Sequence, residues 1–324
     1  MPAVLEIENL RIGWTDSAGE HVIVDGVNMS IDAGEILGIV GESGSGKTLS
    51  MLAVLGLLPA PLTVLGGSIH IGGSPVTPAT APGMRGKRAA MVFQDPMTSL
   101  NPVFTVGAQI AEAVTLHQGL KGRAAMDAAV DALRKVQVPD PERRAKQYPH
   151  ELSGGMRQRV MIAMALACKS EVLLADEPTT ALDVTVQAQI LQLLRQLQRE
   201  TGMAIAFITH DLAVVAELCD RVVVMYGGKV FESTDVETLF AAPGHPYTKA
   251  LLESLPDKAI PGEPLVSIPG QPPTSGQRGT GCPFKARCRV AVSGCDAPLP
   301  LIQLGSSEKP QWVACHRVSE VAGC

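Results

Sequence analysis

Residues 41 to 48 read Gly-Glu-Ser-Gly-Ser-Gly-Lys-Thr and fit the pattern of a phosphate-binding P-loop. The run Ile36–Val40 before them is continuously apolar, and the residues from Thr48 to Leu58 have helical spacing and stop before Pro59. A strand, a glycine-rich loop and a helix in this order are the context that the pattern requires. The sequence therefore predicts a nucleotide site at this loop.

Each residue type in the loop has a physical role. Glycines let the backbone curl so that successive N–H groups point at phosphate oxygens, and the start of the helix adds its partial positive charge. We expect Lys47 to bridge the β- and γ-phosphates and the Thr48 hydroxyl to ligate Mg²⁺. The bland alternative is a flexible glycine turn without a ligand. The residues expected to contact the nucleotide from this segment are Ser43, Gly44, Ser45, Gly46, Lys47, Thr48 and Leu49.

A pair of carboxylates, Asp176-Glu177, comes directly after the apolar run Val172–Ala175. The carboxyl ends of parallel strands are where α/β sheets bind ligands. Asp176 is expected to hold Mg²⁺, through water, and Glu177 to polarise the attacking water as general base. An acidic pair after a strand is also an ordinary helix cap, so it is the P-loop upstream that favours catalysis.

The segment Leu152–Gln158 (LSGGMRQ) opens a strongly apolar helix. Ser153 is a natural N-cap, and the two glycines after it allow a phosphate to approach closely. Such a segment alone is most often only a capped helix.

Taken together, these motifs resemble the ATP-binding subunits of ABC transporters over about Val4 to Tyr226. The residues that carry the resemblance, by order and spacing, are 41–48, Gln94, 152–158, 174–178, 181–183 and His210.

In that family the nucleotide lies between two ATPase subunits arranged head to tail. The resemblance thus implies that Ser153, Gly155 and Gln158 belong to the surface that contacts ATP held by the partner's P-loop. It implies that Asp183 crosses the dimer interface.

The resemblance also assigns catalytic and base-contacting residues. Gln94 would reach the Mg²⁺ and the attacking water, and His210 would contact the γ-phosphate, although a lone histidine is more often structural. Trp14 takes the place of an aromatic residue that stacks on adenine. A packing tryptophan is the alternative there.

Three further segments, 93–102, 148–159 and 245–252, are similar to the oligopeptide/dipeptide importer ATPases. The cysteine-containing tail resembles the C-terminal extension of that group, which implies a [4Fe-4S] cluster on Cys282, Cys288, Cys295 and Cys315. The spacing alone matches neither a usual zinc site nor a ferredoxin run. Zinc with His316, or metal-free thiols, therefore stay open. The other two internal cysteines, Cys168 and Cys219, are expected in the core.

Basic residues near these cysteines, Lys285, Arg287 and Arg289, are expected to favour thiolates.

The resemblance further implies partners and a location. The chain would pair with a homologous sister ATPase, or with itself, beneath two transmembrane permeases fed by a solute-binding protein. It would be peripheral, at the cytoplasmic face of the cell membrane, since no run of about 20 apolar residues and no signal peptide is seen. A net charge of −5 argues against nucleic acid as a partner. The rivals are a soluble ABC ATPase in nucleic-acid or cluster-assembly work, and a non-catalytic regulatory subunit.

The predicted fold class is α/β: a P-loop NTPase core of ABC type, a helical subdomain and a small Cys-rich C-terminal extension. We expect a nucleotide-binding domain over residues 1–240, with the helical subdomain at about 95–160. Residues 241–324, first rich in Pro and Gly and then in Cys, form the extension.

Overall fold

A computed structural model of the 324-residue chain describes residues 3–180, 182–256, 267–273, 279–306 and 309–318. Contacts divide the chain into two compact units, each treated by itself below. The first comprises residues 1–5, 31–35 and 70–208, and the second comprises 6–30, 36–69 and 209–324. No helix within the described ranges is both long enough and apolar enough to cross a bilayer.

The first unit is built on three short parallel strands, β6 (Ala89–Val92), β7 (Val172–Asp176) and β8 (Ala204–Thr209). β7 lies between the other two, with Ala89 opposite Val172 on one side and Val172 opposite Ala204 on the other. All of β7 and β8 is buried, which is why their sequences are continuously apolar until the carboxylate that ends β7.

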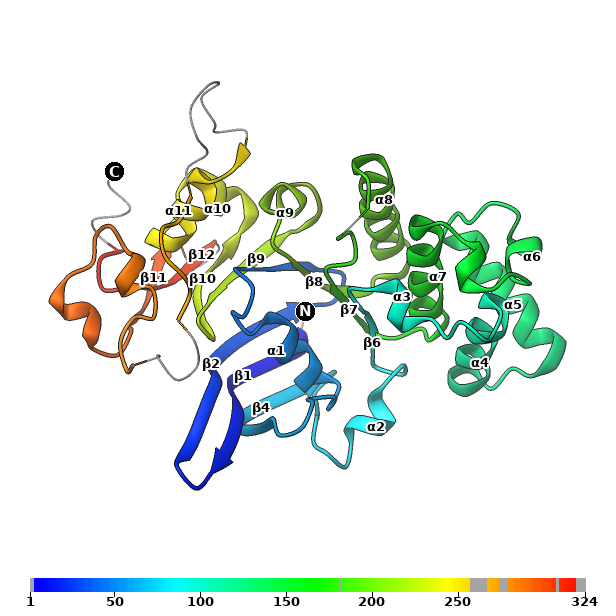
Figure 1. The fold of residues 1–324 in the computed structure, drawn as a ribbon, viewed down its shortest axis with the longest axis horizontal. Coiled ribbons are helices and arrows are strands. Elements are labelled where there is room, and N and C mark those ends of the chain that lie inside the picture. Colours follow the sequence, from blue (N-terminus) through cyan, green and yellow to red (C-terminus); the bar gives the residue numbers. More distant parts are fainter. Residues whose placement is uncertain (1–2, 181, 257–266, 274–278, 307–308, 319–324) are drawn as a thin grey trace. The chain divides into compact units, whose positions relative to one another are not determined.

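Helices make up most of the rest of this unit (Figure 1). α4 packs against α5, and both pack against α7. The predicted helical insertion is therefore a pair of helices, separated where Gly119 adopts a left-handed φ of 74° and ends α4. The helices are α2 (Ala81–Met84), α3 (Pro96–Ser99), α4 (Val106–Gln118), α5 (Gly122–Lys135), α6 (Pro141–Arg144), α7 (Gly154–Ala167) and α8 (Val184–Thr201).

The second unit holds the P-loop strand β3 (Ile36–Val40), which pairs in parallel with β9 (Arg221–Tyr226). β9 is followed by antiparallel β10 (Lys229–Asp235), and β10 pairs with β12 (Pro310–Ala314). β11 (Leu301–Gly305) closes this edge against β12. Two strands of the C-terminal segment thus extend the sheet that contains the P-loop strand.

A separate four-stranded sheet has the order β2-β1-β4-β5, and most of β1, β2 and β4 belongs to the second unit. Its two long neighbouring strands are β1 (Ala3–Asp16) and β2 (Gly19–Asp32). They are completed by β4 (Thr63–Ile71) and the short β5 (Ser74–Pro75). Figure 1 shows β1 and β2 as the long blue hairpin.

The helices of the second unit are α1 (Lys47–Val54), α9 (Leu212–Leu218), α10 (Val236–Ala241) and α11 (Pro246–Glu253). Cys219, at the end of α9, is buried against β3, because a Cβ added to Gly38 would lie 3.0 Å from its Sγ. Cys168 lies at the end of α7 and is only half-buried. The prediction that both cysteines lie in the core is thus confirmed for Cys219. It is wrong for Cys168, which lies at a helix end.

Candidate nucleotide site

The P-loop connects β3 to α1, as its sequence predicts. Gly41 has φ 150°, and a Cβ there would lie 2.0 Å from the carbonyl oxygen of Met225. Gly46, the residue before α1, has φ 100°. Only glycine adopts both conformations without strain, so these two positions set the path of the loop.

Lys47 is held inside the loop. It is 6% exposed, and its Nζ donates to the carbonyl oxygens of Gly41 at 2.6 Å and Glu42 at 3.1 Å. The hydroxyl of Ser45 lies 3.3 Å from the same Nζ. A buried ammonium surrounded by loop oxygens places a positive charge at the start of a helix, where anions are stabilised. Of the other predicted contacts, Ser43, Gly44 and Thr48 are exposed and Leu49 is half-buried.

Two further predicted residues belong to this second unit. His210 is exposed, directly after β8. The indole of Trp14 is half-buried and stacks on the ring of His21, with centroids 4.6 Å apart and planes 10° apart. His21 is in turn 2.9 Å from Asp16, whose pKa is lowered by the backbone N–H of Ala18 and by His21. One face of Trp14 is therefore covered, and stacking on adenine would use the other face.

In the first unit, Gln94 and Glu177 lie together. The Nε2 of Gln94 donates to Oε2 of Glu177 at 3.0 Å, and the hydroxyl of Thr180 donates to the same oxygen at 2.9 Å. Glu177 has a left-handed φ of 45°, and its N–H donates to the carbonyl oxygen of Ile208 at 3.0 Å. A non-glycine residue held in this region is a strained arrangement that recurs at functional sites. Asp176, the residue before it, is buried at the end of β7.

Thr180 is a contact that sequence reasoning missed. The signal in the sequence was its position three residues after Glu177.

The segment at residues 152–158 forms the start of α7. Ser153 is its N-cap, accepting from the N–H of Met156 at 3.4 Å, as predicted. A Cβ on Gly155 would lie 2.6 Å from Cγ1 of Val186, in the first turn of α8. Gln158 is 2% exposed, and its Nε2 has no hydrogen-bond partner among the described residues. Gly155 is therefore needed because α7 packs closely on α8 at this residue. This contact could not be predicted from the sequence.

Comparison with known proteins agrees with this geometry. Residues 24–180 match the ABC transporter family, and residues 231–295 match the oligopeptide/dipeptide transporter C-terminal region. The dipeptide transport ATP-binding protein DppD of Escherichia coli K12 is 45% identical over 324 residues, covering 99% of this chain and 98% of that protein. This chain belongs to the oligopeptide/dipeptide family of ABC transporter ATP-binding proteins. The DppD of Haemophilus influenzae is also 45% identical, over 97% of this chain and 95% of its own length.

Solved structures support the cassette fold. CbiO1 of Clostridium perfringens, part of the ABC transporter complex cbiONQ, superposes with a TM-score of 0.64 at 28% identity, covering 74% of this chain and 92% of that one. The ATP-binding cassette MJ0796, in a post-hydrolysis state bound to ADP and Pi, gives 0.63 at 27% identity, covering 72% and 98%. This member of the family is accordingly an ABC-type ATPase, for which ATP and Mg²⁺ binding are expected.

The cysteines of the C-terminal segment of this ATPase lie near one another. Burial, together with the nearby thiols of Cys315, Cys295 and Cys288, raises the pKa of Cys282 to about 12. Burial also raises the pKa values of Cys288 and Cys315.

The prediction that neighbouring basic residues favour thiolates is wrong. Each of these cations pairs with a carboxylate instead. Lys285 lies 2.5 Å from Asp296, Arg287 lies 2.7 Å from Glu42, and Arg289 lies 3.2 Å from Glu253.

No group of three or more His, Cys, Asp or Glu side chains within the described part of the chain is arranged to hold a metal ion. The geometry therefore gives no support to the predicted [4Fe-4S] cluster, nor to zinc.

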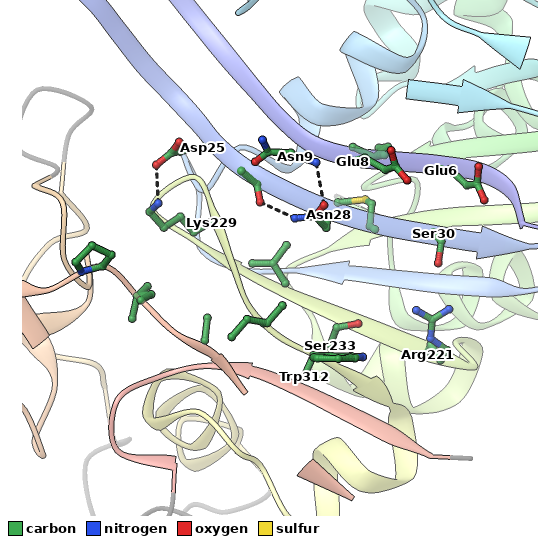
Figure 2. A pocket seen from close by; sticks show the side chains of 18 of the residues that line it. Glu6, Glu8, Asn9, Asp25, Asn28, Ser30, Arg221, Lys229, Ser233 and Trp312 are labelled. Carbon is green, nitrogen blue, oxygen red and sulfur yellow. Dashed lines mark hydrogen bonds and ion pairs between the residues drawn. The ribbon is translucent and has the colours of Figure 1, made fainter. Parts of the chain in front are cut away.

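A separate pocket of about 670 Å³ in the second unit contains none of the predicted nucleotide-site residues (Figure 2). Strands β1, β2, β9, β10 and β12 line it, and Lys229 pairs with Asp25 at 2.5 Å within it. Asn28 accepts from the N–H of Asn9 at 2.8 Å and donates to the carbonyl oxygen of Gly26 at 3.0 Å. The polar groups of Asn28 and the charges of Lys229 and Asp25 are thus already partnered by protein.

Proposed function

We propose that this chain energises an ABC importer for peptides or a related small solute by binding and hydrolysing ATP. The observation that carries the proposal is the pairing of Gln94 with Glu177 in a chain that also holds a buried Lys47 inside an intact P-loop. Peptides are proposed as the transported solute because the chain is 45% identical, over 99% of its length, to a protein named for dipeptide transport.

In the proposed site the P-loop residues Ser43 to Leu49 hold the triphosphate, and Trp14 stacks on the base. The start of α7, with Ser153, Gly155 and the buried Gln158, contacts the nucleotide of the partner subunit, and Asp183 lies at the interface with that subunit. Thr48 and Asp176, with Gln94, offer the oxygen ligands that Mg²⁺ prefers, and the ion would neutralise phosphate charge.

For hydrolysis we assign the general base to Glu177. Its carboxylate takes a proton from the water whose oxygen attacks the γ-phosphorus, the bond to the bridging oxygen breaks, and ADP leaves with the electron pair. Gln94 and Thr180 support this role because both donate to Oε2 of Glu177 and so hold its carboxylate in one orientation. His210 is assigned to the γ-phosphate.

The proposed partners are a second ATPase subunit, two permeases and, through them, a solute-binding protein, with the chain peripheral at the cytoplasmic face of the membrane. Four apolar side chains around Gln94 are exposed: Phe93 40%, Met97 61%, Val103 69% and Phe104 54%. A cluster of exposed apolar side chains marks an interaction surface, and we assign this one, with the helical subdomain, to the permeases. The division at residues 240 and 241 is kept as the proposed domain boundary.

A [4Fe-4S] cluster on Cys282, Cys288, Cys295 and Cys315 is kept as a proposal. Its support is the match of residues 231–295, which include Cys282, Cys288 and Cys295, to the oligopeptide/dipeptide transporter C-terminal region. Iron and sulfide analysis after anaerobic purification tests it, with a Cys282→Ser variant as control. An absence of iron from both proteins would refute the cluster.

The experiment for the function uses the intact complex in vesicles and follows ATP hydrolysis and peptide uptake together. Lys47→Ala should abolish nucleotide binding, whereas Glu177→Gln should bind ATP, dimerise and turn over very slowly. Undiminished hydrolysis by Glu177→Gln would refute the assigned base. Hydrolysis without any permease partner in membranes would favour the soluble ABC ATPase.

A further inference from the structure

A buried arginine of the C-terminal segment contacts the P-loop. Arg287 ends the short 3-10 turn Lys285–Arg287, and its side chain is 7% exposed. Its Nη1 donates to Oε2 of Glu42 at 2.7 Å and to the hydroxyl of Tyr226 at 3.0 Å. Glu42 is the second residue of the P-loop, so a residue 245 positions away in the chain contacts the nucleotide-binding loop.

The guanidinium is fixed on its remaining sides. Nε donates to the carbonyl oxygen of Pro269 at 2.8 Å and Nη2 to that of Ile268 at 3.2 Å. Its central carbon lies 5.7 Å from the ring centroid of Tyr226 and 5.9 Å from that of Phe284. Four oxygen acceptors and two aromatic rings hold the planar guanidinium of Arg287 in one position, so it can anchor the loop.

The backbone of Glu42 is also held by hydrogen bonds. Its N–H donates to the hydroxyl of Tyr247 at 3.0 Å, and its carbonyl oxygen accepts from Lys47 Nζ at 3.1 Å. Tyr247 is fully buried and packs on Tyr226, with ring centroids 4.7 Å apart. The side chain, the N–H and the carbonyl oxygen of Glu42 therefore each have a hydrogen-bond partner. The carbonyl oxygen accepts from the same Lys47 ammonium that is proposed to bind the phosphates.

We propose that Arg287 is a positioning residue for ATP binding, which fixes Glu42 and neutralises its carboxylate beside the phosphate site. This rests on the proposed function of the P-loop. Without Arg287 a negative charge would stand unpaired next to an anion site and repel the triphosphate, and the loop would lose its anchor. ATP affinity should therefore depend on Arg287, whereas the chemical step at Glu177 should not.

The test compares full-length variants by the Kd for a fluorescent ATP analogue and by kcat and KM for ATP. Arg287→Met removes the charge and keeps much of the volume. We expect Kd and KM to rise about tenfold or more and kcat to stay within about threefold, because an unpaired, partly buried carboxylate beside the phosphate site opposes ligand binding rather than catalysis. The matched control is Arg289→Met, whose side chain is 67% exposed and pairs only with Glu253, and it should bind ATP like the wild type.

A double variant distinguishes a positioning role of Arg287 from a general loss of structure. In the double variant Arg287→Met with Glu42→Gln the repelling charge is gone, so Kd should return most of the way to the wild-type value. Lack of rescue, or an Arg287→Met protein that binds ATP as tightly as the Arg289→Met control, would overturn the proposal.

If the Arg287→Met protein does not fold, the Arg287→Lys variant tests the proposal. Lysine keeps the charge but cannot reach Glu42, Ile268 and Pro269 together, so Kd should rise about threefold or more, and an unchanged Kd would overturn the proposal. Lys47→Ala measured alongside tests the underlying function. If it leaves binding intact, the P-loop assignment fails, whereas loss of binding there with no effect at Arg287 refutes only the present inference.

Discussion

Gln94 and Glu177 are separated by 83 positions in the chain, yet Nε2 of one lies 3.0 Å from Oε2 of the other. Thr180 donates to the same oxygen at 2.9 Å. The carboxylate assigned as general base is therefore oriented by two neutral donors from its own unit. Because both bind the same oxygen, they fix the orientation of the carboxylate.

Gln94→Ala should lower kcat for ATP hydrolysis about tenfold, since a hydrogen bond to a charged group contributes about 1.5 kcal/mol or more. Thr180→Val removes the second donor at nearly constant volume and should act in the same direction. The check is steady-state hydrolysis with separate nucleotide binding. Equal kcat in wild type and both variants would show that neither donor positions the base.

Gly155→Ala should destabilise the first unit, because the new methyl group would overlap Cγ1 of Val186 at 2.6 Å. Overpacking of this kind costs about 1–3 kcal/mol. Adding Val186→Ala removes the overlapping methyl and should restore the melting temperature. We expect ATP turnover to stay low in the double variant, because the proposed site also needs glycine for close approach of the partner's nucleotide. A Gly155→Ala protein as stable as wild type would contradict the packing argument.

Glu232→Gln should lower the free energy of unfolding by about 1–3 kcal/mol. The fully buried carboxylate accepts from Gly244 N–H at 2.8 Å and Gln311 Nε2 at 2.7 Å through one oxygen, and from His245 N–H at 3.0 Å through the other. Glutamine would place an amide donor against one of these donors. Urea denaturation measures the change.

The matched control for that variant is Glu237→Gln in α10. Its side chain is 88% exposed and pairs only with Lys309 at 3.3 Å, so the change should stay within about 0.5 kcal/mol. Equal losses in both variants would mean that the donors around Glu232 do not determine its contribution.

Stability should fall on acidification because of His245. Burial lowers the pKa of this histidine to about 3, whereas an unfolded histidine titrates near 6.5. Between these values the unfolded chain binds a proton that the folded chain does not, so stability is full above about pH 6.5 and is lost at about 1.4 kcal/mol per pH unit below it.

The measurement is the free energy of unfolding at pH 7.5 and pH 5.5 for wild type and His245→Asn. Asparagine can keep the N-cap hydrogen bond to Tyr247 N–H, which His245 Nδ1 accepts at 3.0 Å, but it does not titrate. Burial raises the pKa of Glu232, which acts in the opposite sense as pH rises above its unfolded value, but both proteins keep Glu232 and the effect cancels. The same pH slope in both proteins would refute the assignment to His245.

Local signals in the sequence were enough for several elements. Helix α8 (Val184–Thr201) has such signals at both ends, because Asp183 accepts from the N–H of Val186 at 2.9 Å and Gly202 ends the helix at φ 68°. The P-loop was equally readable, since its glycines, lysine and flanking strand lie within a dozen residues.

Other elements lacked such signals. β10 carries the buried polar residues Glu232 and Thr234, which interrupt the apolar pattern of a core strand. β6 (Ala89–Val92) contains two alanines and a methionine, which favour helices when taken alone. β11 and β12 lie in a segment whose prolines and glycines predicted a tail.

By itself, the sequence determined the P-loop, the family and the helix that follows Asp183, because caps, glycine turns and apolar periods act between residues a few positions apart. Only the tertiary structure decided that Gln94 meets Glu177, that Gly155 packs on Val186, and that Arg287 holds Glu42. Each of these contacts joins segments far apart in the chain, where no local preference of the backbone specifies the partner, and burial of the surrounding apolar side chains brings them together.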